Sequence, residues 1–153
     1  MSIYDTNLDK NNANYVPLTP LTFLKRAKEI YPNYEALIYE DRKFTWDQVY
    51  KRTVKFASAL NKIGVGKGDT VSFLAFNTPE IFEGHYSVPM TGAVLNTINI
   101  RLDAKTIAYI LNHSEAKVLV VDRQLHVEVK KALTTLKKKI TIIDINDKFA
   151  DQS

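Results

Sequence analysis

Two stretches of the chain carry apolar residues every three or four positions, which is the spacing of one face of a helix. The first stretch runs over residues 20–31 and lies between a Thr-Pro pair and a second proline, which are typical of helix boundaries. The second stretch runs over residues 46–63, and Thr45 and Gln48 have the spacing of a capping box at its start. The pattern therefore predicts two helices in the first part of the chain.

Shorter apolar segments predict strands. Residues 35–45 read as two short strands around a turn at Asp41-Arg42. The further predicted strands are 70–76, 93–100, 117–121 and 140–144. The helical patterns between them begin at Thr78-Pro79, Asp103 and Leu125, and the last of these extends to Leu136. Strands that alternate with helices form a parallel sheet covered on both faces, so the predicted fold class is α/β, doubly wound, with a small hairpin in front of it.

The chain divides into an arm and one folded unit. Residues 1–16 are rich in Asn and Asp and are predicted to be a flexible arm, and residues 17–153 are predicted to form one α/β subdomain. The first residues have no apolar run typical of a secretory signal, and no stretch of about 18 apolar residues could span a bilayer. We therefore expect a soluble protein without a transmembrane segment, located in the cytoplasm, with an organelle matrix left open.

Composition and charge exclude several classes of function. The 21 basic and 17 acidic residues are interleaved, and the lysines gather only at 130–131 and 137–139. No aromatic residues lie among these lysines to stack on bases, so we expect a solvated helix end and turn there, and no nucleic-acid partner. The chain has no cysteine. Disulfides, thiolate chemistry and cysteine-bound zinc are therefore excluded for this sequence.

The segment GVGKGDT, residues 64–70, resembles a phosphate-binding loop at first sight. That motif requires a Gly-Lys-Ser/Thr ending between a strand and a helix, whereas Lys67 is followed by Gly68. The segment also leaves a predicted helix and enters a predicted strand, so no helix N-terminus is available to hold an anion. We interpret it as a turn whose glycines supply left-handed conformations.

Three polar residues are the candidates for a site. Asn96, Asn99 and Arg101 follow an apolar start at the carboxyl end of a strand that we expect to be central, and ligands of open α/β sheets bind at that edge. The alternative is that both amides satisfy backbone groups of the loop and that Arg101 pairs with a nearby acid. His85 is expected to be a partly buried, hydrogen-bonded core histidine, and His126 to be exposed at a helix start.

The longest resemblance to a known family extends over residues 19–122. Its segments are LTFLKRA, then ALIYEDRKFTWDQVYKRTVKFASALNKIGVGKGDTVSFLAFNTPE, then GHYSVPMTGAVLNTINIRLDAKTIAYILNHSEAKVLVVD. In this order and spacing they resemble the N-terminal part of the adenylate-forming (AMP-binding) acyl-CoA synthetases. The run GAVLNTINIRLDA is most similar to members that activate short- or medium-chain fatty acids or aromatic acids.

This resemblance implies a two-step ligation in the complete enzyme. A carboxylic acid and ATP give an acyl-adenylate and pyrophosphate, and the thiol of coenzyme A then displaces AMP. The family's phosphate loop, adenine pocket and catalytic lysine have no counterpart in this chain, so no catalytic, cofactor-binding or metal-binding residue is assigned to it. ATP, Mg²⁺ and coenzyme A are expected for the complete enzyme, and no cofactor is expected for this chain alone.

The leading interpretation is an N-terminal fragment of an AMP-forming acyl-CoA ligase that is inactive by itself. Its partners would be the remainder of the ligase and, in the full enzyme, a carboxylic acid substrate. Asn96, Asn99 and Arg101 would then fix their loop to the missing subdomain. The isolated chain should expose apolar surface and tend to associate. The alternative is a complete, non-catalytic α/β module that binds a nucleotide or a protein partner.

Overall fold

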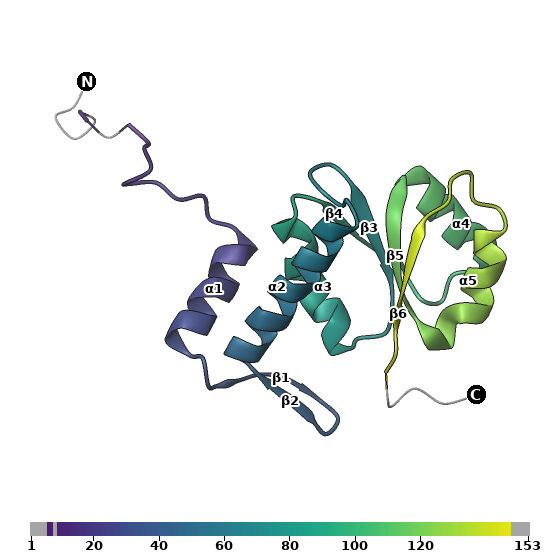
Figure 1. The fold of residues 1–153 in the computed structure, drawn as a ribbon, viewed down its shortest axis with the longest axis horizontal. Helices are drawn as coiled ribbons and strands as arrows, with labels where there is room; N and C mark the ends of the chain where they lie inside the picture. The colour runs from purple at the N-terminus through teal and green to yellow at the C-terminus, as the bar shows by residue number, and fades with distance from the viewer. Residues whose placement is uncertain (1–5, 8, 148–153) are drawn as a thin grey trace.

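A computed structural model describes residues 6, 7 and 9–147 of the chain. Its elements follow one another as α1 (Pro20–Ile30), β1 (Glu35–Tyr39), β2 (Arg42–Thr45), α2 (Trp46–Lys62), β3 (Thr70–Leu74), α3 (Pro79–Met90), β4 (Val94–Thr97), α4 (Ala104–His113), β5 (Ala116–Asp122), η2 (Arg123–Leu125), α5 (His126–Leu133) and β6 (Thr141–Ile145). Figure 1 shows one sheet between two groups of helices, with the hairpin β1–β2 at one end of α2.

The main sheet has four strands in the order β4-β3-β5-β6, and all three pairings are parallel. Val71, Phe73 and Val120 face one layer of helices, whereas Leu119 and Val121 face the other. Five of the seven residues of β5 are apolar and buried, because a central parallel strand has no face in contact with water. The predicted parallel sheet, and the central position of the 117–121 segment in it, are confirmed.

The direction of winding explains which face each helix covers. The chain moves from β3 to the β4 edge through α3, and then moves in the opposite direction through α4 to β5 and through α5 to β6. Right-handed crossovers in opposite directions place their helices on opposite faces of a sheet. Accordingly, α2 and α3 lie on one face and α4 and α5 on the other (Figure 1), so the doubly wound α/β fold is confirmed.

The first half of the chain follows the sequence pattern closely. Helix α2 begins with the predicted capping box, in which the Thr45 hydroxyl accepts from the Gln48 N–H and the Gln48 side chain accepts from the Thr45 N–H. The hairpin turn lies at Glu40 and Asp41, because Tyr39 pairs with Arg42. The predicted turn was therefore shifted by one residue, and Glu40 takes the left-handed conformation that the tight turn needs.

Other predicted boundaries were too long. The strand predicted over 93–100 ends at Thr97 and lies at the edge of the described sheet, so its predicted central position was wrong. The strand predicted over 70–76 ends at Leu74. Helix α5 ends at Leu133, although Leu136 still packs against the core beyond it. Apolar side chains extend past each of these ends because they line the core from loops as well as from regular elements.

The described part of the predicted arm contains turns and no helix or strand before α1. It leads away from the body of the molecule in Figure 1. Residues 1–5 and 8 lie outside the described residues, so the division into an arm and a subdomain remains a prediction.

Candidate functional site

The predicted site residues lie at the carboxyl edge of β3 and β4. A groove of about 550 Å³ opens there, and its polar lining includes Asn77, His85, Asn99 and Arg101. Asn77 follows β3, Asn99 and Arg101 follow β4, and His85 comes from α3. The sheet edge therefore brings together two of the three predicted residues and His85, while Asn96 takes a different position.

Asn96 lies inside β4 and faces the α4 layer. Its Nδ2 atom donates to the Oγ atom of Ser72 at 3.0 Å and to the Oγ atom of Ser114 at 3.3 Å. Ser72 is its register partner on β3 and is fully buried, and Ser114 is the C-cap of α4. A buried hydroxyl without a partner is costly, so the asparagine stabilises the contact between the two strands and the helix end.

Asn99 and Arg101 lie in the loop between β4 and α4, and both are exposed. The Oδ1 atom of Asn99 accepts from the Arg101 N–H at 2.9 Å, which closes an Asx turn. No ion pair of the Arg101 guanidinium is found within the described part of the chain. Arg101 is thus an exposed cation in the lining of the groove, and the role of Asn96, Asn99 and Arg101 in supporting a site remains a prediction.

The two histidines depart in part from their expected environments. His85 is exposed on α3, so its expected burial was wrong, but its Nδ1 atom lies 2.8 Å from the Ile81 carbonyl oxygen as a hydrogen-bonded histidine should. His126 lies at the start of α5 as expected, but it is only partly exposed because its Nε2 atom lies 2.9 Å from Oδ1 of Asp144.

A network of charged residues that the sequence pattern did not indicate joins α2, α3 and the hairpin. Arg52 of α2 donates two hydrogen bonds to the carboxylate of Glu83 of α3. Its Nε atom donates to Oε1, and its Nη2 atom donates to Oε2 at 3.1 Å. The Glu80 Oε1 atom accepts from Nη2 of Arg42 at 3.0 Å and from Nη2 of Arg52 at 3.4 Å. The four residues therefore form one connected chain of ion pairs across three elements.

Because Glu83 is buried, this network contributes to the stability of the fold. The Glu83 side chain is 6% exposed and that of Arg52 is 38% exposed. Burial raises the pKa of Glu83, and the hydrogen bonds from Arg52 act in the opposite direction. Removing one partner of a buried pair costs roughly 3–5 kcal/mol, so the arginine is required once the acid is buried. The feature of the sequence that could have indicated this network is Glu83, an acid on the same face of α3 as the small residues Gly84 and Ser87. The structure shows all three to be buried.

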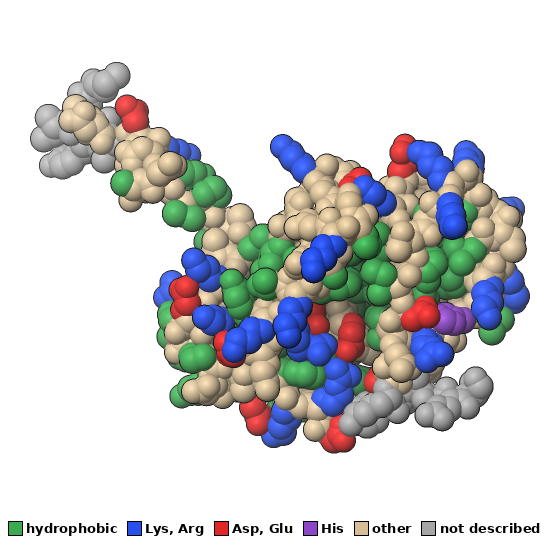
Figure 2. All heavy atoms as spheres, in the orientation of Figure 1, with side chains coloured by type: hydrophobic (Ala, Val, Ile, Leu, Met, Phe, Trp, Pro, Cys, Tyr) green, Lys and Arg blue, Asp and Glu red, His purple; other side chains and the backbone are tan. Residues whose placement is uncertain are grey.

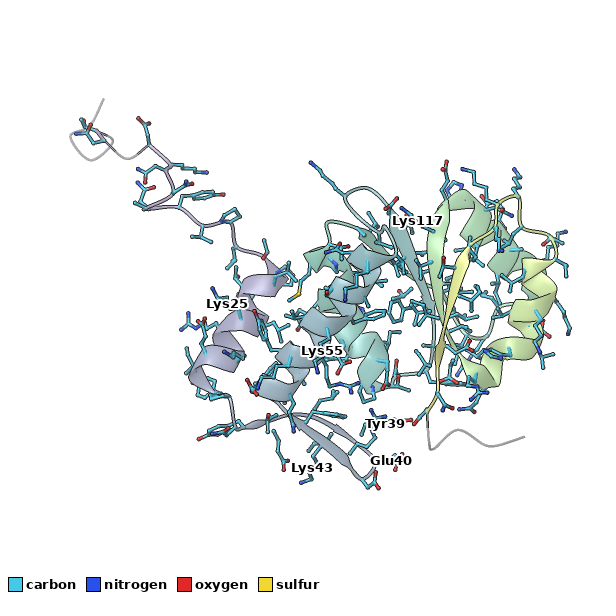
Figure 3. All side chains as sticks on the ribbon, viewed as in Figure 1. Lys25, Tyr39, Glu40, Lys43, Lys55 and Lys117 are labelled. Carbon is cyan, nitrogen blue, oxygen red and sulfur yellow. The ribbon has the colours of Figure 1, made fainter. Side chains whose placement is uncertain are left out.

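The hairpin is attached to the end of the sheet by Tyr39 (Figure 3). Its hydroxyl donates to Oδ2 of Asp147 at 2.5 Å, and this bond, with burial, raises the pKa of Tyr39 to about 12. Arg42 stacks 5.1 Å from the Phe44 ring centroid and lies 3.9 Å from Asp147. Residues more than 100 positions apart are thus joined at the carboxyl edge of the sheet.

Asp122 ends β5 at the same edge and is fully buried. Its Oδ1 atom accepts from the Gln124 N–H at 3.0 Å, whereas its Oδ2 atom has no hydrogen-bond partner. Burial is the main reason that the pKa of Asp122 is raised, and the nearby charges of Asp147 and Glu80 raise it further. The charged form of Asp122 is therefore less favourable in the folded chain than in the unfolded chain.

The glycine segment at 64–70 is the predicted turn from helix to strand. Gly64 and Gly68 have φ angles of 84° and 86°, which confirms their left-handed conformations. Asp69 accepts from the Gly66 N–H at 2.8 Å and from Lys117 at 2.9 Å, and the Lys117 bond is the main reason for its lowered pKa. The Gly66 N–H and the Lys117 ammonium group therefore already bind Asp69 within the protein.

These observations decide what the described residues can bind. Within the described ranges, no three His, Asp or Glu side chains gather to hold a metal ion. Arginines or Tyr39 hold the carboxylates of Glu80, Glu83 and Asp147, and the glycine turn follows a helix and precedes a strand. The assignment of ATP, Mg²⁺ and coenzyme A to the complete enzyme remains a prediction.

Known proteins with similar sequences and structures identify the class. The sequence profile of the AMP-binding enzymes matches residues 24–153. The peroxisomal trans-cinnamate:CoA ligase of Petunia hybrida is 54% identical over 129 residues, which are 84% of this chain and 23% of the petunia protein. The peroxisomal butyrate–CoA ligase of Arabidopsis thaliana is 57% identical over 116 residues, 76% of this chain and 20% of that ligase.

Solved structures agree with the sequence relatives. The anthranilate CoA ligase AuaEII, in complex with anthranoyl-AMP, superposes with a TM-score of 0.78 at 26% identity, covering 82% of this chain and 24% of that structure. A fatty acyl CoA synthetase of Mycobacterium tuberculosis gives a TM-score of 0.76 at 25% identity, covering 82% and 26%. The fold is therefore that of adenylate-forming CoA ligases.

The chain belongs to the family of AMP-binding enzymes, and its relatives are plant acyl-CoA ligases that it matches in their N-terminal part. It spans about a fifth of the length of the curated relatives that it matches. Among the helices of the described residues, none has the length and apolar character needed to cross a membrane.

We expect Asn96→Leu to destabilise the chain by about 1–3 kcal/mol, because the buried Ser72 hydroxyl then loses its donor. Urea unfolding followed by the fluorescence of Trp46, the one tryptophan of the sequence, measures this loss. The double variant Asn96→Leu/Ser72→Ala should regain part of the lost stability, since neither polar group remains unpaired. A double variant less stable than Asn96→Leu would contradict the assigned role of this hydrogen bond.

We expect Asp122→Asn to stabilise the chain at pH 7 by about 1 kcal/mol, because it removes a buried charge and keeps the oxygen that accepts from Gln124. The folded pKa is raised above 3.8, so the unfolded chain releases its proton first and the free energy of unfolding falls as pH rises from there. The stabilisation should therefore vanish below pH 3.8 in urea titrations.

Asp103 provides the control for Asp122→Asn, because its pKa is shifted in the opposite direction. Its pKa is lowered by hydrogen bonds from Thr106 at the start of α4, so its stabilising effect is present at neutral pH and is lost as pH falls. Asp103→Asn should therefore reduce stability at pH 7. Equal effects of Asp103→Asn and Asp122→Asn at neutral pH would refute the raised pKa of Asp122.

Proposed function

We propose that this chain is the N-terminal part of an ATP-dependent, AMP-forming acyl-CoA ligase. The observation that carries the proposal is the 54% identity to the petunia trans-cinnamate:CoA ligase over 84% of the chain. The 129 matched residues are most of the chain. The complete enzyme would convert a carboxylic acid, ATP and coenzyme A to acyl-CoA, AMP and pyrophosphate.

The proposed substrates are short- or medium-chain fatty acids or aromatic acids. The relatives include ligases named for trans-cinnamate, butyrate and benzoate, which supports both groups of acids. The pocket for the acid is proposed to lie in the remaining part of the ligase, because the described residues offer no enclosed site with convergent polar groups. The proposed location is the cytoplasm or an organelle matrix, and several relatives are named as peroxisomal.

The chain's own role is proposed to be structural, and the chain alone to be inactive. It supplies a sheet and two helical layers, while the groups that bind ATP, Mg²⁺ and coenzyme A belong to the remainder. Asn96 holds the end of β4 against β3 and α4, and the Asn99 turn directs Arg101 toward the groove at the sheet edge. These three residues would position the loop against the missing subdomain.

A chimera tests the proposed function directly. The petunia ligase would receive residues 24–153 of this chain in place of its own matching segment. We expect trans-cinnamate:CoA ligase activity within about tenfold of the parent, or about 1.4 kcal/mol in activation free energy, since the reacting groups come from the parent. Pyrophosphate release and cinnamoyl-CoA formation are the measurements.

The 153-residue chain alone is the control and should release no pyrophosphate. A folded chimera without activity would overturn the proposed function. Saturable binding of a nucleotide by the isolated chain, without ligation in the chimera, would favour the alternative, a complete non-catalytic binding module.

The loop is tested in the same chimera with Asn99→Ala/Arg101→Ala. We expect activity to fall by roughly tenfold or more, because a loop that supports a site must hold its neighbours to within about half an ångström. The denaturation midpoint of the variant should stay close to that of the chimera, since both side chains are exposed. Unchanged activity would remove the supporting role.

A further inference from the structure

The surface between α2 and β6 has a groove that the carboxyl-edge site does not use. Its volume is about 430 Å³. We call it the α2–β6 groove, and its lining includes Lys55, Phe56, Glu80, Val120, Ile143 and Ile145, with the paired Arg52 and Glu83 and with Asp144 beside them. Figure 2 shows hydrophobic side chains at the surface between α2 and β6, with acidic and basic side chains beside them.

The floor of the groove is continuous with the hydrophobic core. Val120 and Ile145 are buried core residues, and the partly exposed Phe56 and Ile143 pack against the same cluster. The Phe56 ring meets the buried Phe73 edge-on at 6.2 Å between centroids. On this face of the sheet, α2 and α3 cover the neighbouring strands, but β6 has no helix of the described chain above it (Figure 1).

The winding of the chain restricts what can cover this face. The crossovers to β5 and to β6 place α4 and α5 on the opposite face. A helix that continued the same right-handed winding beyond β6 would join α4 and α5 there. The groove must therefore be covered by a segment that arrives from a different direction, either elsewhere in the same protein or in another molecule.

The charges around the groove indicate what the covering segment offers. Lys55 is exposed, and no ion pair of its ammonium group is found among the described residues (Figure 3). The Oε1 atom of Glu80 accepts from two arginines, whereas its buried Oε2 atom has no donor. A complementary segment would present apolar side chains to the floor and an acid to Lys55.

We propose that the α2–β6 groove is the docking site of an amphipathic segment from the remaining part of the ligase. This inference rests on the proposed function, because the chain spans about a fifth of its curated relatives and the rest of the protein supplies the occupant. The segment lies on the face of the sheet that α2 and α3 cover. It covers the part of that face, over β6, that the helices of the described chain leave open. Its apolar side chains extend the core formed by Phe56, Val120 and Ile143.

Single cysteines in the petunia chimera test this docking. The chain has no cysteine of its own, so Lys55→Cys places one thiol of this chain at the rim of the groove. Lys51→Cys is the matched control, one turn away on α2, exposed and outside the groove. Mass spectrometry of the peptide that carries each thiol measures its rate of alkylation by iodoacetamide, native and in urea.

We expect native alkylation at position 55 to be at least about tenfold slower than at position 51 in the chimera, since a covered thiol reacts only when the contact opens. In the isolated 153-residue chain the two rates should agree within about threefold, because the groove is open there. Equal rates in the chimera would overturn the proposal. Protection at position 55 that appears in the isolated chain as its concentration rises would also overturn it, since the occupant would then be a second copy.

The outcomes separate this inference from the proposed function. An active chimera with an unprotected thiol at position 55 would refute the docking and leave the ligase proposal intact. An inactive chimera with a protected thiol would support the docking and count against the ligase proposal. Both substitutions replace exposed lysines on one helix, so neither should affect folding, and the urea midpoint of each variant checks this.

Discussion

The pairing of β3 with β5 at the centre of the sheet determines where the other elements lie. These two strands have neighbours on both sides and are buried on both faces. Each face therefore needs its own layer of helices, because the apolar side chains on both faces must be kept from water. The chain meets this requirement by winding in two directions from β3, so that each direction supplies the helices of one face.

Polar contacts hold the parts that the hydrophobic core does not orient. Asn96 joins two strands to a helix end, Lys117 joins the turn before β3 to the start of β5, and Tyr39 joins the hairpin to the end of the sheet. Hydrophobic burial is non-directional, whereas each of these bonds has one geometry. The apolar surface thus supplies most of the stabilisation, and the polar contacts determine how the elements are placed.

The sequence predicted what depends on neighbouring residues. The capping box of α2, the Asp103 cap of α4 and the apolar strand β5 are local patterns, and all three appear in the structure. The edge position of β4 could not be predicted, since strand order depends on residues far along the chain. The resemblance to acyl-CoA ligases reached further than periodicity, because it draws on the order of many segments.

The candidate site was less accessible from the sequence. Asn96 was a site candidate at the carboxyl end of its strand, whereas the structure shows a partly buried amide whose partners, Ser72 and Ser114, are 24 and 18 residues away. The pairs formed by Arg42 with Glu80 and by Arg52 with Glu83 join residues 38 and 31 positions apart. Nothing in the spacing of such residues indicates that they meet, because the pairing depends on how α2, α3 and the hairpin pack.

The strand order also has a consequence for synthesis on the ribosome. The central partners β3 and β5 are separated by α3, β4 and α4, so roughly 40 residues must follow Leu74 before Ala116 emerges. At ~5–20 residues per second this takes about 2–8 s. During that interval β3 has only the future edge strand as a neighbour, and one of its faces lacks a helical cover. The nascent chain is therefore most exposed to aggregation, and most in need of chaperones, before β5 is complete.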